Sequence, residues 1–263
     1  MEPKELAQAI DRYVRPETFP LALRVLQREE EIPQKARLPH RDLGIQVSIC
    51  QGISMARRYG WTIAMSGEDL SCPIAQVAFA FREAPPFYAE GNLAKGMYAK
   101  DADGARRTER VVARAEVAGT VVVAPLSRAE FVPEVVAVYG NSAQVMRMVA
   151  AALFDKGGSI ISEFSARADC AEIVNRTRQT HKPQVILPCY GDRVFGQTQD
   201  HEMAFTFPWE DAESFRAGLE GTHQGGVRYP IPHYLRYTAD YPATYETVKA
   251  IWREEDEEGG AGG

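Results

Sequence analysis

The chain has 263 residues, 45% of them hydrophobic and 25% charged, which is the composition of an ordinary globular protein with room for a sizeable core. Its formal net charge of −6 argues against a nucleic-acid-binding protein, because such proteins usually present a basic face. No apolar run approaches the roughly 20 residues that cross a bilayer, and the charged N-terminus lacks the apolar centre of a signal peptide. We therefore expect a cytoplasmic protein whose thiols stay reduced.

Hydrophobic periodicity predicts helices that alternate with strands. The expected strands are residues 21–26, 44–50, 61–65, 120–126, 135–139, 159–164, 184–189 and 202–207. The expected helices are residues 3–14, 53–60, 105–117, 143–157, 169–177, 209–219 and 244–252, and the run 74–81 fits either state. This order predicts an α/β or mixed α+β fold. We expect a single compact domain over residues 1–252 and a disordered acidic and glycine-rich tail at 253–263.

A weak internal similarity relates residues 20–90 to residues 119–207. In both stretches a strand, a helix, a strand and a cysteine follow one another, and a glutamine, Gln51 or Gln144, stands in the first turn of the helix. A duplication would give two structurally similar halves. Chance explains the similarity equally well, because this order of elements is common. In the first of the two helices, Ile53 and Ala56 are expected to face inward, with Arg57 and Arg58 facing outward.

The four cysteines are the first candidate site. Cys50, Cys72, Cys170 and Cys189 each lie at the boundary of a predicted element, which is where ligands of a metal are usually found. Four thiolates that converge on one point can hold a [4Fe–4S] cluster or a structural zinc ion. No pair has the Cys-x-x-Cys spacing that would make such an assignment specific, and free cysteine is often a buried packing residue. Both interpretations stay open on the residues alone.

The second candidate is the turn that follows the strand at 184–189. Arg193 would bind a carboxylate or phosphate there, or lower the pKa of Cys189 and make this thiol nucleophilic. The alternative is a local ion pair between Asp192 and Arg193 that closes the turn. Since ligands of helix-flanked sheets collect beyond the carboxyl ends of strands, we expect the other cysteines to meet Cys189 here.

The third candidate is the corner at Gly140, Asn141 and Gln144. A strand, a glycine and exposed N–H groups of a helix together favour anions. No known phosphate-loop pattern matches, so Asn141 or Ser142 could simply cap the helix.

Other polar groups carry weaker signals. Glu68 and Asp69, beside Cys72, form either a carboxylate pair or an exposed turn. No Gly-x-Ser-x-Gly elbow is present, and the histidines show neither HxH nor HExxH spacing. The histidines considered are His181, His201, His223 and His233.

Three segments together resemble domain-of-unknown-function family 169, a prokaryotic family met largely in anaerobic bacteria and archaea. They are CQGISMARRYGWTIAMSGEDLSCP at 50–73, VAVYGNSAQVMRMVAAALF at 136–154 and LPCYGDRVF at 187–195, within a resemblance that spans roughly residues 21–207. The resemblance implies that the four cysteines, the Gly140–Gln144 corner and the turn at 191–193 belong to the family's pattern. It supplies no reaction, but an anaerobic habitat would favour iron–sulfur over zinc.

These observations predict a protein in which Cys50, Cys72, Cys170 and Cys189 bind a [4Fe–4S] cluster with a redox or Lewis-acid role. Arg193 and the N–H groups after Gly140 would offer positive potential to the cluster or to a small anionic ligand. The alternatives are a metal-free protein that binds a small anion or uses a catalytic cysteine, and a structural zinc protein. The sequence does not decide whether the protein is an enzyme. A redox partner would follow from a cluster, and a homodimer is expected only because dimers are common among bacterial enzymes.

Overall fold

A six-stranded antiparallel sheet organises the computed structural model, which describes residues 1–231 and 239–260. The strand order is β2-β3-β1-β4-β6-β5, and every pair of neighbours is antiparallel. The strands are β1 (Leu21–Leu26), β2 (Ile63–Met65), β3 (Thr120–Pro125), β4 (Val135–Gly140), β5 (Gln184–Ile186) and β6 (Met203–Pro208). The fold is therefore of the mixed helix-and-strand class that was expected.

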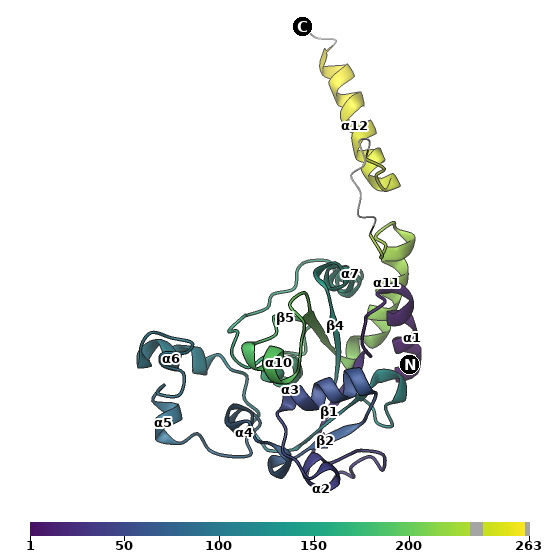
Figure 1. Ribbon diagram of the computed structural model, residues 1–263. Helices are drawn as coiled ribbons and strands as arrows, with labels where there is room; N and C mark the ends of the chain where they lie inside the picture. Colours follow the sequence, from purple (N-terminus) through teal and green to yellow (C-terminus); the bar gives the residue numbers. More distant parts are fainter. Residues whose placement is uncertain (232–238, 261–263) are drawn as a thin grey trace.

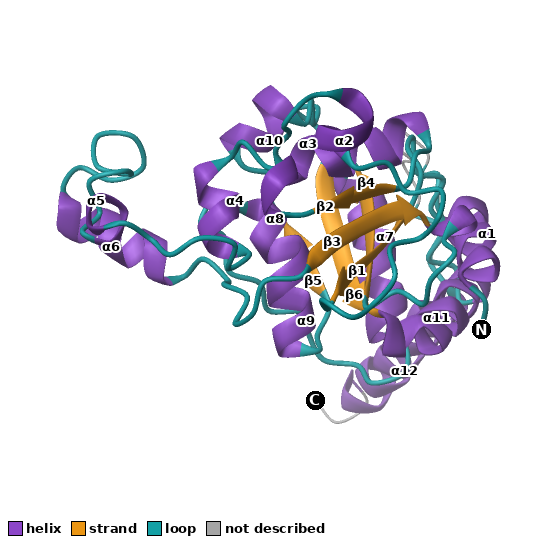
Figure 2. Ribbon diagram, turned by 90° about the horizontal axis from the view of Figure 1, so that it is seen from below, coloured by secondary structure: helices purple, strands orange, loops and turns teal. Residues whose placement is uncertain are grey.

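Helices cover both faces of this sheet (Figure 2). The longer helices are α1 (Pro3–Tyr13), α7 (Ser142–Leu153), α11 (Ala212–Gln224) and α12 (Ala243–Gly260), with α6 (Ala102–Arg110) in a peripheral lobe. The shorter ones are α2 (Pro39–Leu43), α3 (Ile49–Ser54), α4 (Pro73–Ala78), α5 (Pro86–Ala89), α8 (Asp169–Ala171), α9 (Thr177–Thr180) and α10 (Tyr190–Phe195). Single 3₁₀ turns lie at Gly67–Asp69, Leu126–Arg128 and Trp209–Asp211.

Two helices continue into π-helical turns. The first, η1 (Met55–Tyr59), extends α3, and the second, η4 (Glu172–Arg176), joins α8 to α9. A π turn has more than 3.6 residues, so it rotates the following side chains relative to an α-helix. This rotation explains why Arg57 is buried, contrary to the expectation that it faces solvent.

Each face of the sheet has its own apolar core. Side chains of alternate residues such as Leu21, Leu23 and Tyr139 pack against α3 and the segment around α8. Ala22, Val136 and Phe205 belong to the opposite core, together with residues of α1, α7 and α11. The period of two along each strand produces this division, because successive side chains point to opposite faces.

Two expected strands are absent. Residues 159–164 form no strand: Ile161 stays 82% exposed, and the side chain of Ser162 accepts the N–H of Val185 at the outer edge of β5. Residues 44–50 make one isolated bridge, Val47 to Leu70, before Ser48 caps α3. In both segments a polar side chain binds a backbone N–H group in place of a continuous ladder.

Two parts extend from the body (Figure 1). The first is the segment 82–118, which connects α4 to β3 and lies to one side of the body. It includes α5 and α6 and is called the α5–α6 lobe below. The second is helix α12, which projects away from the body near the C-terminus. It runs to Gly260, whereas the sequence predicted a disordered tail from residue 253. The last part of that tail, 261–263, lies outside the described residues.

Candidate functional site

All four cysteines lie at the first turn of a helix. Cys72 and Cys189 are the N-cap residues of α4 and α10, and Cys50 and Cys170 are the second residues of α3 and α8. The free N–H groups of a helix start carry partial positive charge, which favours a thiolate over a thiol. The four cysteines lie at element boundaries as expected, but Cys50 and Cys189 begin helices and do not end strands.

The four thiols share one region of the structure. Helix α3 packs against α10 and α4 packs against α8, which brings together the segments that carry Cys50 and Cys189, and those that carry Cys72 and Cys170. The pKa of the Cys170 thiol is raised mainly by burial. The charge of Asp169 makes the next largest contribution, and the other three cysteines add smaller ones. Such mutual effects require proximity. No disulfide joins any of them.

Burial keeps the thiols of Cys50, Cys170 and Cys189 protonated in the metal-free protein. It raises the pKa of Cys50 to about 12, with a further contribution from Asp192 that the hydroxyl of Ser48, 2.9 Å from the sulfur, opposes. The pKa of Cys189 is also raised, first by burial and then by Asp169. This direction is opposite to the lowering by Arg193 that would make Cys189 a nucleophile.

Two buried carboxyl groups lie among the thiols. Asp192 accepts hydrogen bonds from the Tyr139 hydroxyl at 3.2 Å and from the Thr198 hydroxyl at 2.9 Å. Asp169 is 1% exposed and lies beside the Asp192 carboxyl and the Cys189 thiol. Burial, and then the charge of Asp192, hold the pKa of Asp169 well above its ordinary value. The raised pKa favours the neutral form of this carboxyl, which lies beside Cys189.

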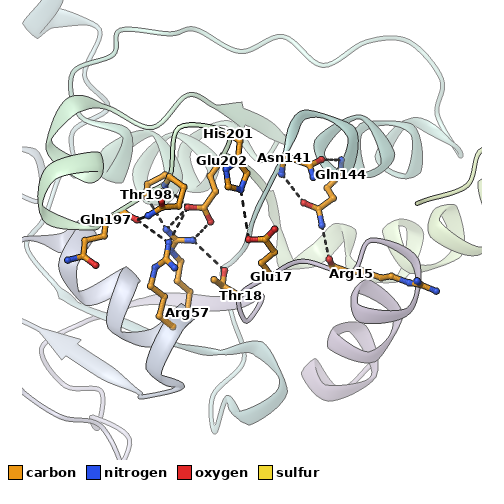
Figure 3. Close-up of polar contacts among 12 residues, drawn as sticks. Arg15, Glu17, Thr18, Arg57, Asn141, Gln144, Gln197, Thr198, His201 and Glu202 are labelled. Atoms are coloured by element: carbon orange, nitrogen blue, oxygen red, sulfur yellow. Dashed lines mark hydrogen bonds and ion pairs between the residues drawn. The ribbon is translucent and has the colours of Figure 1, made fainter. Parts of the chain in front are cut away.

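A buried arginine extends this polar region to the edge of the sheet (Figure 3). Arg57 is 1% exposed and pairs with both carboxylate oxygens of Glu202, at 2.5 and 3.1 Å. It also donates to the Thr198 hydroxyl at 3.0 Å, and its guanidinium carbon lies 4.1 Å from the centre of the Tyr139 ring. Thr198 and Tyr139 both bind Asp192, so a continuous set of contacts runs from Glu202 to the thiols.

Sequence reasoning missed Arg57 and Glu202 as members of the site. Both are ordinary charged residues, Arg57 within the predicted helix at 53–60 and Glu202 at the start of the predicted strand at 202–207, and 145 positions separate them. The π turn that moves Arg57 inward has no signature in a hydrophobicity pattern.

Comparison with known proteins decides the family. The model of domain of unknown function 169, described as uncharacterised ArCR, matches residues 9–217. The chain belongs to this family. A relative from Methanocaldococcus jannaschii, described as uncharacterized protein MJ0308, is 26% identical over 208 residues, which are 78% of this chain and 88% of that protein. No solved structure matches the chain significantly.

The side chains at the Gly140 corner cap the start of helix α7. Asn141 and Gln144 form a reciprocal capping box, in which the Asn141 side chain accepts the N–H of Gln144 at 3.0 Å and the Gln144 side chain accepts that of Asn141 at 2.8 Å. Gln144 also donates to the Arg15 carbonyl at 2.7 Å (Figure 3). Helix α7, which starts here, packs on the face opposite the thiols. The cap interpretation thus accounts for these side chains, and an anionic ligand there stays a prediction.

The expected turn at 191–193 is a helix whose two charged side chains have separate partners. Arg193 donates to the carbonyl of Gln199 at 2.8 Å, whereas Asp192 is buried with Tyr139 and Thr198. The alternative of a local ion pair between Asp192 and Arg193 is therefore not borne out among the described residues.

The remaining candidates serve the fold. Asp69 is buried, and its side chain accepts the N–H groups of Ser66 and His40. His181 and His201 are exposed and lie near surface glutamates, while His233 is outside the described residues. Among residues 1–231 and 239–260, no set of three or more His, Cys, Asp or Glu side chains is already arranged around a metal position. None of the described helices is long and apolar enough to span a bilayer.

Proposed function

We propose that Cys50, Cys72, Cys170 and Cys189 bind a [4Fe–4S] cluster and that the protein has a redox or Lewis-acid role. The observation that carries the proposal is that four unpaired thiols, from four separate helix starts, lie in one region, three of them buried and that of Cys72 half-buried. Four cysteine thiolates are the usual ligand set of such a cluster. The free thiols are those of a reducing compartment, so we propose a cytoplasmic location.

The residues around the thiols suit a negatively charged centre. Each thiol lies at a helix start, whose partial positive charge would offset part of the charge of a thiolate-bound cluster. Asp169, whose raised pKa favours the neutral form, lies beside Cys189 and can donate a hydrogen bond to sulfur in that form. Hydrogen bonds to sulfur are among the factors that set the reduction potential of a cluster. When bound, the cluster would supply one-electron redox chemistry or a Lewis-acidic iron.

The metal-free state has a different chemistry. The raised pKa values of Cys50 and Cys189 keep them as thiols, so these residues are poor nucleophiles near neutral pH. Binding of a cluster must therefore release thiol protons. Cluster assembly should consequently become more favourable as the pH rises.

Purification without oxygen tests the proposal. We expect a brown protein with about four iron and four acid-labile sulfide per chain. Changing any of the four cysteines to serine should remove most of the visible absorbance. Ser71→Ala, adjacent to Cys72 but without a thiol, is the matched control and should keep the colour.

Three outcomes would contradict the cluster. A colourless protein with one equivalent of zinc that is lost in the Cys→Ser variants would make the site a structural zinc site. A metal-free protein with four titratable thiols would favour a small-molecule-binding protein or thiol enzyme. A brown protein whose colour survives every single substitution would place the cluster elsewhere.

A further inference from the structure

A second cavity lies at the edge of the sheet, apart from the cysteines. It has a volume of about 610 Å³ and is bounded by the start of α1, the loop before α2, the residues that follow η1, and the turn after β3. Its position is at the opposite end of the α3–η1 helix from Cys50, and Gly60, which ends that helix, lines it. The volume is in the range of small-molecule sites, roughly 300–1,000 Å³.

Positive charge gathers in this cavity although the chain as a whole has a net charge of −6. Four cationic side chains line it, against the two carboxylates Glu2 and Glu130. Glu130 pairs with Lys35, and Glu2 caps helix α1 by accepting the backbone N–H of Glu5. The cationic residues are Lys4, Lys35, Arg37 and Arg128.

Lys4, Arg37 and Arg128 form no direct ion pair among the described residues, although the charge of Arg37 contributes to the lowered pKa of Asp42. The excess of cations over carboxylates is two charges. A cavity with this excess attracts a doubly charged anion more strongly than a singly charged one.

The two guanidinium groups are held in place before any ligand arrives. Arg37 lies over the ring of Trp61, with its guanidinium carbon 3.8 Å from the ring centre. Arg128 lies over the ring of Phe19 and donates to the carbonyl of Gly60 at 3.2 Å. Side chains that are already ordered lose less conformational entropy on binding, and a planar guanidinium matches phosphate oxygens in pairs.

Gly60 provides the space for the guanidinium group of Arg128. Its φ of +74° is a left-handed conformation that ends the helix, and a Cβ atom there would lie 2.7 Å from the nearest nitrogen of Arg128. Glycine therefore lets the guanidinium rest against the backbone at the wall of the cavity.

We propose that this cavity binds a small phosphate-bearing molecule, with Arg37 and Arg128 as the residues that contact the phosphate and Lys4 adding to the positive potential. The charge excess matches a phosphate dianion, and the fixed guanidiniums match its oxygens. The proposal is independent of the cysteine site, and it does not use the corner at Gly140 or Arg193.

Calorimetric titration of the full chain with inorganic phosphate, and separately with pyrophosphate, tests this site at constant low ionic strength. We expect saturable binding with one site per chain. Arg37→Gln and Arg128→Gln should each weaken it by about tenfold, the loss of one charge-assisted pair. Arg216→Ala removes an exposed arginine outside the cavity and should leave the affinity unchanged.

Anions of different charge identify the ligand class. Sulfate, a dianion, should compete with phosphate, whereas acetate should not. Arg37→Lys keeps the charge but loses the planar fork, so it should restore only part of the affinity, and circular dichroism would check that each variant is folded.

The proposal is overturned if neither phosphate nor pyrophosphate binds saturably. It is also overturned if Arg216→Ala weakens binding as much as the cavity variants, which would indicate general attraction of anions. Competition by acetate as strong as that by sulfate would exclude the phosphate class. These measurements use no metal, so they do not depend on the proposed cluster.

Discussion

At the scale of single residues, the pair of Arg57 and Glu202 shows how burial and charge are balanced. Both side chains are almost fully buried, and each hydrogen bonds to the other and to further polar groups. Removing one partner of such a pair leaves an uncompensated charge in the interior, which typically costs about 3–5 kcal/mol. The pair also supports Thr198, which in turn holds Asp192 near the thiols.

The stability of the protein should fall in acid through Glu202. Burial alone would raise the pKa of this carboxyl, but hydrogen bonds from Arg57 and from the backbone N–H of Gln199 lower it overall below the ordinary value of 4.5. A carboxyl whose pKa is lowered by folding stabilises the protein above its unfolded pKa. That stabilisation is lost as the pH falls through the folded pKa.

Urea unfolding of the wild type and of Glu202→Gln, from about pH 3 to about pH 7, measures this effect. The variant should be less stable near neutrality, and the difference between the two proteins should narrow in acid. Glu116→Gln, at an exposed carboxyl, is the control and should run parallel to the wild type. A difference between wild type and Glu202→Gln that stays constant with pH would contradict the assignment.

At the scale of elements, one buried ion pair fastens the α5–α6 lobe to the cysteine region. Arg167, three positions before Cys170, donates to Glu109 of α6 at 2.5 and 2.9 Å, and Tyr88 of α5 donates to the same carboxylate at 2.7 Å. The guanidinium carbon of Arg167 is 4.6 Å from the centre of the Tyr98 ring. The lobe is thus held both by its chain connections and by a charged contact beside α8.

A double-mutant cycle measures that contact. Arg167→Met and Glu109→Gln should each destabilise the protein by about 3–5 kcal/mol, because each leaves a buried charge without its partner. The double variant should cost less than the sum of the two single changes. The exposed pair of Arg106 and Asp103, on the same helix, should show coupling below about 1 kcal/mol. Purely additive effects at Arg167 and Glu109 would contradict the buried pair.

Close packing of α7 on α11 depends on Gly218. A Cβ atom there would lie 2.0 Å from the carbonyl oxygen of Ala151. Because this oxygen belongs to the backbone of α7, the clash could be relieved only by moving one of the two helices. We expect Gly218→Ala to lower the free energy of unfolding by about 1–3 kcal/mol in denaturant titrations. Gly225→Ala is the matched control, because its nearest neighbour would be 3.4 Å away. Equal stabilities of the two variants would contradict this tight packing.

At the scale of the whole molecule, the body consists of the sheet with helices on both faces, and α12 stands apart from it (Figure 1). The described side chains of α12 are mostly exposed, including Tyr245 and Trp252 at 60% each. The family match ends at residue 217, before this helix begins. The helix therefore contributes little buried surface to the stability of the body.

A chain that ends after Pro242 should keep the stability of the full protein. Since α12 buries little apolar area, we expect the midpoint of thermal unfolding to change by less than about 2 °C. Scanning calorimetry of the two chains side by side is the measurement. A drop of several degrees would show that α12 packs on the body in solution.

Local patterns predicted the elements better than their arrangement. The strands at 21–26, 120–126, 135–139 and 202–207 were found because continuous or alternating apolar residues lie between turn-forming residues. The sequence predicted neither the strand order nor the antiparallel pairing of all neighbouring strands. Strand order depends on contacts between distant segments, which a single sequence does not display.

The sequence by itself determined the mixed fold class, most helix and strand positions and the placement of the four cysteines at element boundaries, since these follow from local periodicity and capping chemistry. Only the tertiary structure decided that the helix starts that carry the thiols pack together, that Arg57 turns inward to Glu202, and that the Gly140 corner is a helix cap. The same structure gathered the cations of the second cavity from four separate segments. Such assemblies arise when packing brings together residues far apart in the chain, and no pattern along the chain encodes them directly.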